Sequence, residues 1–293
     1  MSTLAERIRW GLLPAVPVPF RGHRLDGEAQ RGYARWMAGQ PVAGVAVWAH
    51  TGRGPHLSAE QRTEVLETWR EALPQRVIVA GARDITMAIA ARRGRADALL
   101  AFPERNDPVG YHRRLSRELP LIAFYLYEAA GGVAYDDATL HAILELPGVL
   151  GIKVATLDSV MTFQRIAGLM RSHPDKILVT GEDRFYGYSV MAGATAALIG
   201  MGAALTEPQA ELLHAFRDRQ WDRFVALSAL CDRLAQATFT EPMEGYIRRM
   251  LWAAAAEGAL PREACDDPWG PALPPREREI VEQVVADARS ARS

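Results

Sequence analysis

The sequence has few lysines, few cysteines and no long hydrophobic run. Its two cysteines, Cys231 and Cys265, give neither a metal-ligand spacing nor a disulfide framework, so we expect a reducing, cytoplasmic compartment. The N-terminus mixes charged and apolar residues, and we expect no signal peptide and no membrane-spanning helix. The 34 basic and 35 acidic residues leave a net charge of −1, which gives no sign of a nucleic-acid or membrane partner.

The scarcity of lysine is the most informative of these features. Lys153 and Lys176 are the only lysines among the 34 basic residues, and arginine supplies all the others. This preference for arginine over lysine gives no reason to expect a lysine at any position. We therefore ask where the two lysines lie and what they could do there.

Apolar runs typical of buried strands recur along the chain, with helical patterns between them. The runs cover 12–20, 42–49, 77–82, 98–102, 121–127, 149–155, 177–181 and 196–201. Helical spacing is clear in 58–73, 135–147 and 159–172, and Ser58 and Gln61 form a capping-box pattern at the first of these. Strands that are apolar throughout have both faces covered, and eight of them alternating with helices predict a (β/α)8 TIM barrel.

We divide the chain into a barrel core over residues 1–205 and a second part over 206–293. The second part holds the last barrel helix and a C-terminal helical appendage. Its three expected helical segments are 208–236, 243–258 and 276–291, with a proline-rich stretch at 266–275. The segments 84–94 and 107–119 are short for outer helices, so we expect the third and fourth barrel helices to be clipped.

Lys153 lies near the C-terminal end of the run 149–155, where barrels of this kind carry their functional groups. Its neighbours are aliphatic, and burial lowers the pKa of a lysine and favours the neutral, nucleophilic amine. Condensed with a keto group, this amine forms an imine that draws electrons from the adjacent carbon. On position alone a second interpretation stays open, in which Lys153 caps the strand and faces water or pairs with a carboxylate.

Polar residues and glycines follow other predicted strands. Tyr125 lies near the end of the run 121–127 and can relay a proton if it faces Lys153, although a core tyrosine with a satisfied hydroxyl fits the same position. After the second strand, Gly52 lets backbone amides approach a carboxylate and Thr51 adds a hydroxyl, although an ordinary glycine-rich loop fits equally well. The substrate-binding candidates are His50, Thr51, Gly52, Gly181, Glu182 and Leu198. We expect no metal, because His50 and His56 lack zinc-ligand spacing.

Together these features resemble the pyruvate-dependent class I aldolase superfamily of dihydrodipicolinate synthase and N-acetylneuraminate lyase, over nearly the whole chain. The resemblance is strongest in LSAEQR at 57–62, in GIK at 151–153, and in the interval from Tyr125 to Lys153, which matches the family without a gap. It implies a Schiff base on Lys153, a proton relay at Tyr125, no cofactor, and a homo-oligomer, either a dimer or a tetramer.

The loop after the second strand departs from the family's pattern. It reads AHTGR, so His50 replaces a hydroxyl residue that helps to bind the keto-acid carboxylate, and Arg53 replaces a glutamate. We expect His50 to donate a hydrogen bond to that carboxylate or to Tyr125, or else to turn into the barrel wall. The arginine with which the synthase binds its semialdehyde falls here on Ala130, so a role in lysine biosynthesis is not expected.

The sequence therefore predicts a carbon–carbon lyase, a class I aldolase that acts on pyruvate or a related 2-keto acid and on an aldehyde, such as a sugar-derived one. One alternative is a 2-keto-3-deoxy sugar acid dehydratase that uses the same lysine imine. Another, from a different class, is a catalytically inactive paralogue that binds a keto acid.

Overall fold

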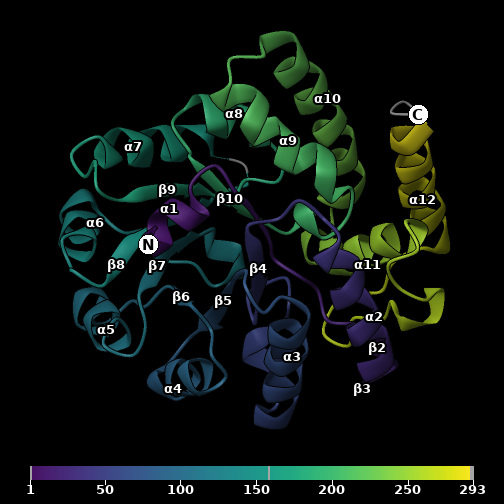
Figure 1. Ribbon diagram of the computed structural model, residues 1–293, viewed down its shortest axis with the longest axis horizontal. Coiled ribbons are helices and arrows are strands. Elements are labelled where there is room, and N and C mark those ends of the chain that lie inside the picture. The colour runs from purple at the N-terminus through teal and green to yellow at the C-terminus, as the bar shows by residue number, and fades with distance from the viewer. Residues whose placement is uncertain (1, 158, 291–293) are drawn as a thin grey trace.

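The computed structural model describes residues 2–157 and 159–290, and it shows a closed barrel of parallel strands (Figure 1). The strands are β1 (Leu12–Pro14), β4 (Gly44–Val47), β5 (Val77–Ala82), β6 (Ala98–Ala101), β7 (Leu121–Leu126), β8 (Val149–Ala155), β9 (Ile177–Thr180) and β10 (Ala196–Ile199). Their order in the sheet is β1-β10-β9-β8-β7-β6-β5-β4, and Val16 N donates to Ala46 O at 3.1 Å where β1 meets β4. Each predicted run holds one of these strands, and the predicted TIM barrel is confirmed.

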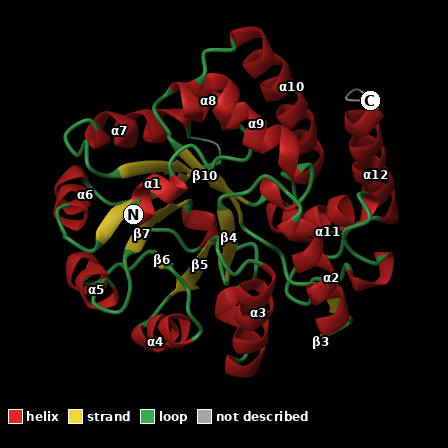
Figure 2. Cartoon of the chain, in the orientation of Figure 1, coloured by secondary structure: helices red, strands yellow, loops and turns green. Residues whose placement is uncertain are grey.

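Helices surround the strands (Figure 2). They are α2 (Gly27–Ala38), α3 (Ala59–Ala72), α4 (Ile85–Arg93), α5 (Pro108–Leu115), α6 (Asp137–Leu144), α7 (Val160–Met170), α8 (Tyr186–Met191) and α9 (Thr206–Arg217). The capping box at the start of α3 is confirmed, because Ser58 Oγ accepts from Gln61 N and Gln61 Oε1 accepts from Ser58 N. The third and fourth helices are short as predicted, since α4 has 9 residues and α5 has 8.

Further elements close the barrel and extend it. Helix α1 (Leu4–Ile8) covers the N-terminal end of the strands, where Ile8 joins the barrel interior. A hairpin of β2 (Phe20–Arg21) and β3 (Arg24–Leu25) was not predicted. The C-terminal helices are α10 (Trp221–Thr238), α11 (Tyr246–Ala256) and α12 (Pro275–Ser290). None of the helices in the described part of the chain is long and apolar enough to cross a membrane.

The segment 208–236 is helical as predicted, but the structure divides it between two helices, α9 and α10. The first helix ends at Arg217, and Arg219 then adopts a left-handed backbone with φ of 59° before α10 begins at Trp221. The turn lets the two helices pack against each other. No glycine or proline marks this turn, so the sequence carries no local signal for it. The predicted division of the chain at residues 205 and 206 falls where α9 begins.

Side chains of the strands form two apolar layers, one inside the barrel and one between strands and helices. Successive residues of a strand point to opposite faces. On β7, Phe124 and Leu126 belong to the interior layer, whereas Tyr125 belongs to the outer layer. Strand β8 pairs with β7 so that Lys153 lies beside Phe124. This register decides which side chains share the interior with Lys153.

Candidate active site

Lys153 projects from β8 into the barrel interior and is 5% exposed. Its Nζ lies 4.0 Å from the centroid of the Phe124 ring, and it makes no hydrogen bond or ion pair with the residues that the structure describes. Burial lowers the pKa of Lys153 to about 8, against the charges of Asp183 and Glu182, which raise it. A Cβ at Gly181 would lie 2.5 Å from Lys153 Cε, so a glycine there leaves room for the lysine side chain.

Lys176 lies at the opposite end of the barrel. It immediately precedes β9, and its Nζ donates to Val149 O at 2.9 Å, at the first residue of β8. It also pairs with Asp175 at 3.4 Å. Lys176 is thus held by backbone and carboxylate at the N-terminal ends of the strands, and Lys153 is the lysine on the side of the mouth.

A small chamber of about 30 Å³ surrounds the Lys153 side chain. Its walls come from the ends of several strands and from the C-terminal helices. They are His50, Thr51, Phe124, Leu126, Tyr127, Lys153, Ala155, Leu157, Gly181, Asp183, Gly200, Phe239 and Tyr246. Thr51 Oγ1 and the Tyr246 hydroxyl share a hydrogen bond of 3.0 Å, and burial holds the pKa of Tyr246 well above its usual value.

The carboxylate of Glu244 accepts hydrogen bonds from three side chains at the edge of this chamber. It accepts from His50 Nε2 at 3.0 Å, from Arg53 Nη1 at 2.9 Å and from the Tyr127 hydroxyl at 3.1 Å. Burial opposes ionisation here, but hydrogen bonds and charges from His50 and Arg53 outweigh it and lower the pKa of Glu244 to about 2. The His50 ring also stacks on Tyr246, with 6.1 Å between centroids. His50 therefore lines the chamber with its Nε2 directed to Glu244 rather than to Tyr125.

Asp183 is the carboxylate that faces Lys153 across the chamber. Its Oδ1 accepts from Met201 N at 2.7 Å, and burial raises its pKa to about 7 against the opposing charge of Lys153. Glu182, predicted as a binding residue, points elsewhere and is fully buried. Its oxygens accept from Thr156 N at 2.7 Å and from Leu157 N at 2.9 Å, so it anchors the loop after β8.

Tyr125 does not face Lys153, contrary to the predicted arrangement. The register pairs Phe124 with Lys153, so the next residue of β7 points away from the barrel interior. The Tyr125 hydroxyl lies 3.5 Å from Arg165 Nη2, and its ring meets that of Tyr135 edge-on. The chamber is instead lined by the phenol of Tyr127, two positions further along the chain, together with that of Tyr246.

Two other predicted residues lie outside the chamber. Gly52 packs against the chain after β1, where an added Cβ would be 2.9 Å from Val16 O. Leu198 is fully buried inside the barrel, among the apolar side chains of the interior layer. The structure thus brings together Lys153, His50, Thr51 and Gly181 from the predicted set, but not Tyr125, Gly52, Glu182 or Leu198.

The set of site residues predicted above does not contain Tyr127, Asp183, Glu244 or Tyr246, although the segment 181–183 is expected from the sequence to line the mouth. Asp183 directly follows Glu182, and Tyr127 follows Tyr125 by two positions, so both lie beside residues of the predicted set. For Glu244 and Tyr246 no local motif exists. They reach the chamber only through long-range packing of the C-terminal segments.

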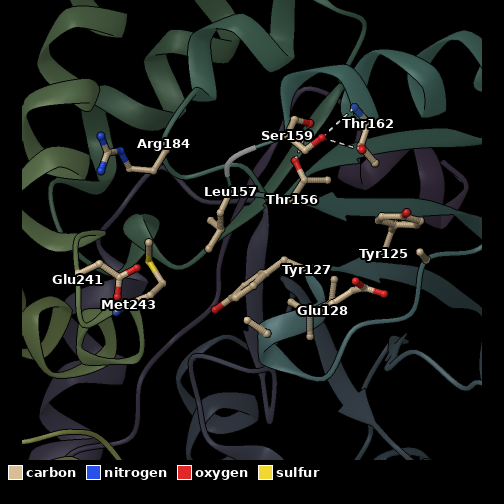
Figure 3. Close-up of a pocket in the computed structure, with 13 residues that line it drawn as sticks. Tyr125, Tyr127, Glu128, Thr156, Leu157, Ser159, Thr162, Arg184, Glu241 and Met243 are labelled. Carbon is tan, nitrogen blue, oxygen red and sulfur yellow. Dashed lines mark hydrogen bonds between the residues drawn. The ribbon is translucent and has the colours of Figure 1, made fainter.

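A larger cleft of about 750 Å³ lies beside the chamber (Figure 3). The two spaces share Leu126, Tyr127 and Leu157 as a common wall. In Figure 3, Arg184, Glu241 and Met243 stand on one side of the cleft and Tyr125 stands on the other, with Tyr127 between them. Leu157 adopts a left-handed backbone with φ of 59°, which is uncommon for a side chain of its size.

No family model matches the chain. It is 32% identical over 187 residues to 4-hydroxy-tetrahydrodipicolinate synthase of Ruegeria pomeroyi, a match that covers 59% of this chain and 63% of the relative. It is 26% identical over 201 residues to N-acetylneuraminate lyase of Salmonella paratyphi B, covering 63% of this chain and 66% of the relative. The matches therefore span slightly less than two thirds of these curated relatives.

The fold of the chain matches that of solved structures over nearly its full length. The chain matches a catalytic lysine mutant of Ruminococcus gnavus sialic acid aldolase with a TM-score of 0.85 and 20% identity, covering 99% of each chain. At that identity the likeness establishes the fold. In sequence the chain is thus similar to a 4-hydroxy-tetrahydrodipicolinate synthase and to an N-acetylneuraminate lyase, and in fold to a sialic acid aldolase.

Proposed function

We propose that the chain is a class I aldolase, a carbon–carbon lyase that holds pyruvate or a related 2-keto acid as a Schiff base on Lys153 and joins it to, or releases it from, an aldehyde. The observation that carries this proposal is the Lys153 amine itself. It is buried at the mouth of the barrel, lacks a hydrogen-bond or ion-pair partner among the described residues, and has its pKa lowered to about 8. A larger share of neutral amine is therefore available near neutral pH than in a solvated lysine.

The reaction follows from this amine. Neutral Nζ attacks the keto carbon, and the keto oxygen leaves as water to give an iminium. Loss of a proton from the neighbouring carbon gives an enamine, which attacks the aldehyde carbon while the aldehyde oxygen takes up a proton. Water then hydrolyses the iminium and frees both the product and the lysine. The same steps in reverse cleave the bond.

Proton transfer requires a group that lines the chamber, and we propose Tyr127 for this role in place of Tyr125. Burial raises the pKa of Tyr127 above its usual range, so the phenol stays protonated and can donate. Its hydroxyl is held by Glu244 at 3.1 Å. Asp183, with its pKa raised to about 7, is available nearby as a proton acceptor.

The keto acid needs more room than the chamber offers. A volume of about 30 Å³ corresponds to about one water molecule, so the substrate enters only after the wall moves. Tyr127 and Leu157 form that wall between the chamber and the cleft. The proposed function therefore includes an opening step, in which these side chains swing toward the cleft.

Reductive trapping tests the proposal. With pyruvate and cyanoborohydride, intact-mass and peptide spectra should show one reduced adduct at Lys153. Lys153→Ala should lose this adduct, whereas Lys176→Ala, the matched control at the other end of the barrel, should keep it. An adduct at Lys176, or none with any 2-keto acid, contradicts the mechanism and favours the inactive paralogue. Product analysis then separates an aldolase, which releases an aldehyde, from a dehydratase, which releases water.

The proposal also covers the cellular compartment and the oligomeric state of the enzyme. Cys231 and Cys265 are buried and form no disulfide among the described residues, and we propose a reducing, cytoplasmic compartment. We also propose a homo-oligomer, a dimer or a tetramer, which sedimentation velocity measurements would test.

A further inference from the structure

We infer that Arg184 binds an anionic group, a carboxylate or a phosphate, on the end of the aldehyde that is distant from its carbonyl. This inference rests on the proposed function, because it names the class of the second substrate. It concerns the large cleft beside the lysine chamber. That cleft is wide enough for a substrate with several carbons, since its volume is about 750 Å³.

Arg184 lines the cleft from the loop between β9 and α8, directly after Asp183. Asp183 faces the lysine chamber and Arg184 faces the cleft, so consecutive residues serve the two spaces. A substrate that reacts at Lys153 and extends through the opened wall of Tyr127 and Leu157 enters the cleft that Arg184 lines. The arginine is therefore placed to bind the far end of the substrate rather than the reacting atoms.

The guanidinium of Arg184 has donors to spare. Its Nη1 donates to Phe239 O at 2.7 Å, and its Nε is buried without a partner. Among the described residues no carboxylate lies within 4.0 Å of it. A guanidinium carries five N–H donors in a planar fork that matches a carboxylate or a phosphate. The unused donors at the cleft thus fit an oxyanion.

Other arginines show that this arrangement is not general. An unpaired buried Nε also occurs in Arg62, Arg70 and Arg248. Each of these arginines donates at least two hydrogen bonds to backbone carbonyls. None of them lines the cleft. They are structural arginines. Arg184 differs because a single backbone hydrogen bond orients it and leaves the rest of its fork for a ligand.

Charge within the cleft also favours this position for an anion. Arg184 is the only basic residue among those that line it, and the acidic ones are Glu128 and Glu241. Glu241 accepts from Met243 N at 3.0 Å and forms no ion pair with Arg184. The hydroxyls of Thr156 and Ser159 are already donating within the protein. Arg184 is therefore the one cationic position among the lining residues, and the glutamates disfavour an anion near them.

Calorimetric titration with unreactive probes tests Arg184 without relying on imine chemistry. Glycerol 3-phosphate and glycerate carry the anion, glycerol is the neutral control, and none of them has a carbonyl that could react with Lys153. We expect both anions to bind the wild-type chain more tightly than glycerol. Arg184→Gln should raise their Kd by about 10- to 100-fold, as expected for loss of hydrogen bonds to a charged group. Arg184→Lys should recover part of the affinity, because it keeps the charge without the fork.

Arg248→Gln is the matched control and should leave both anion affinities unchanged. Thermal unfolding of each variant checks that Arg184→Gln remains folded. Equal affinities for the anions and glycerol in the wild-type chain would overturn the inference, as would an Arg184→Gln variant that binds the anions normally. Reductive trapping with pyruvate is carried out in parallel on the same proteins. A normal Lys153 adduct with no anion preference rejects Arg184 alone, whereas anion binding without any adduct rejects only the imine.

Discussion

Arg53 and Asp267 lie 214 residues apart in the chain and meet in a buried two-point ion pair. Arg53 Nε donates to Oδ1 at 3.1 Å and Nη2 donates to Oδ2 at 2.7 Å. The pair ties the loop after β4 to the C-terminal part of the chain, from which Glu244 and Tyr246 reach the lysine chamber. Arg53 thus connects the loop after β4 to the C-terminal segments that cover the site.

Breaking this pair should destabilise the protein strongly. Arg53→Met leaves the Asp267 carboxylate buried, at 3% exposure, without its cation. Removal of one partner from a buried pair typically costs about 3–5 kcal/mol of unfolding free energy. Urea denaturation at pH 7 measures this loss. Arg217→Met is the control, because Arg217 makes the same two-point contact with Asp218 at the exposed surface, and it should change stability little. Similar effects for both variants would show that burial does not matter here.

The barrel could be predicted from the sequence because each strand carries its own signal. An apolar run such as 149–155 is buried on both faces wherever it lies in a parallel sheet, and Ser58 and Gln61 mark the start of α3 by contacts three residues apart. Lys153 could be predicted for a related reason, since its neighbours within the same strand determine its burial.

The rest of the site depends on register and on contacts between distant segments. The pairing of Phe124 with Lys153 turns Tyr125 away from the chamber, whereas Tyr127 lines it from the segment that begins after β7 ends at Leu126. Glu244 is recognisable only once Arg53 and His50 are seen to converge on it. Because no spacing rule connects these residues, a single sequence does not reveal their association.

The lowered pKa of Lys153 predicts the pH dependence of trapping. Attack requires the neutral amine, so the rate of adduct formation with pyruvate should rise as pH increases through about 8, well below the value near 10.4 of a solvated lysine. Asp183→Asn should move this profile to lower pH, because it removes a charge that raises the pKa of Lys153. Initial trapping rates between pH 6 and 10 measure both profiles. A wild-type midpoint above pH 10 would show that the amine is not desolvated in solution.

The phenols of Tyr125, within β7, and of Tyr127, directly after it, give a direct comparison. Tyr127→Phe removes the hydroxyl that lines the chamber and keeps the ring in its wall, so turnover should fall by roughly 10²–10⁴-fold while trapping with pyruvate persists. Tyr125→Phe should leave turnover near the wild-type value, because that hydroxyl contacts Arg165 in the outer layer. The opposite pattern, a large loss only in Tyr125→Phe, would restore the role that the family spacing implies.

Glu244 should make stability depend on acid pH. Its pKa in the folded chain, about 2, lies below its ordinary value of 4.5, so ionised Glu244 stabilises the fold above about pH 4.5, and this contribution disappears as pH falls toward 2. Glu244→Gln should therefore lower the unfolding free energy at pH 7, by about 1 kcal/mol, because the side chain is 38% exposed and solvent weakens its contacts. The difference between the two proteins should shrink between pH 4.5 and 2.

His50→Thr tests which group lowers the pKa of Glu244 and so sets the pH range over which its stabilising effect is lost. Without the imidazole, Glu244 keeps Arg53 and Tyr127 but loses a donor that lowers its pKa, so its stabilising effect should disappear at a higher pH than in the wild-type chain. Urea titrations from pH 2.5 to 7 resolve the shift, and Glu67→Gln, at an exposed glutamate of α3, controls for the loss of one surface charge. If His50→Thr and the wild-type chain lose stability over the same pH range, then Arg53 alone accounts for the lowered pKa, and His50 is free to bind the keto-acid carboxylate.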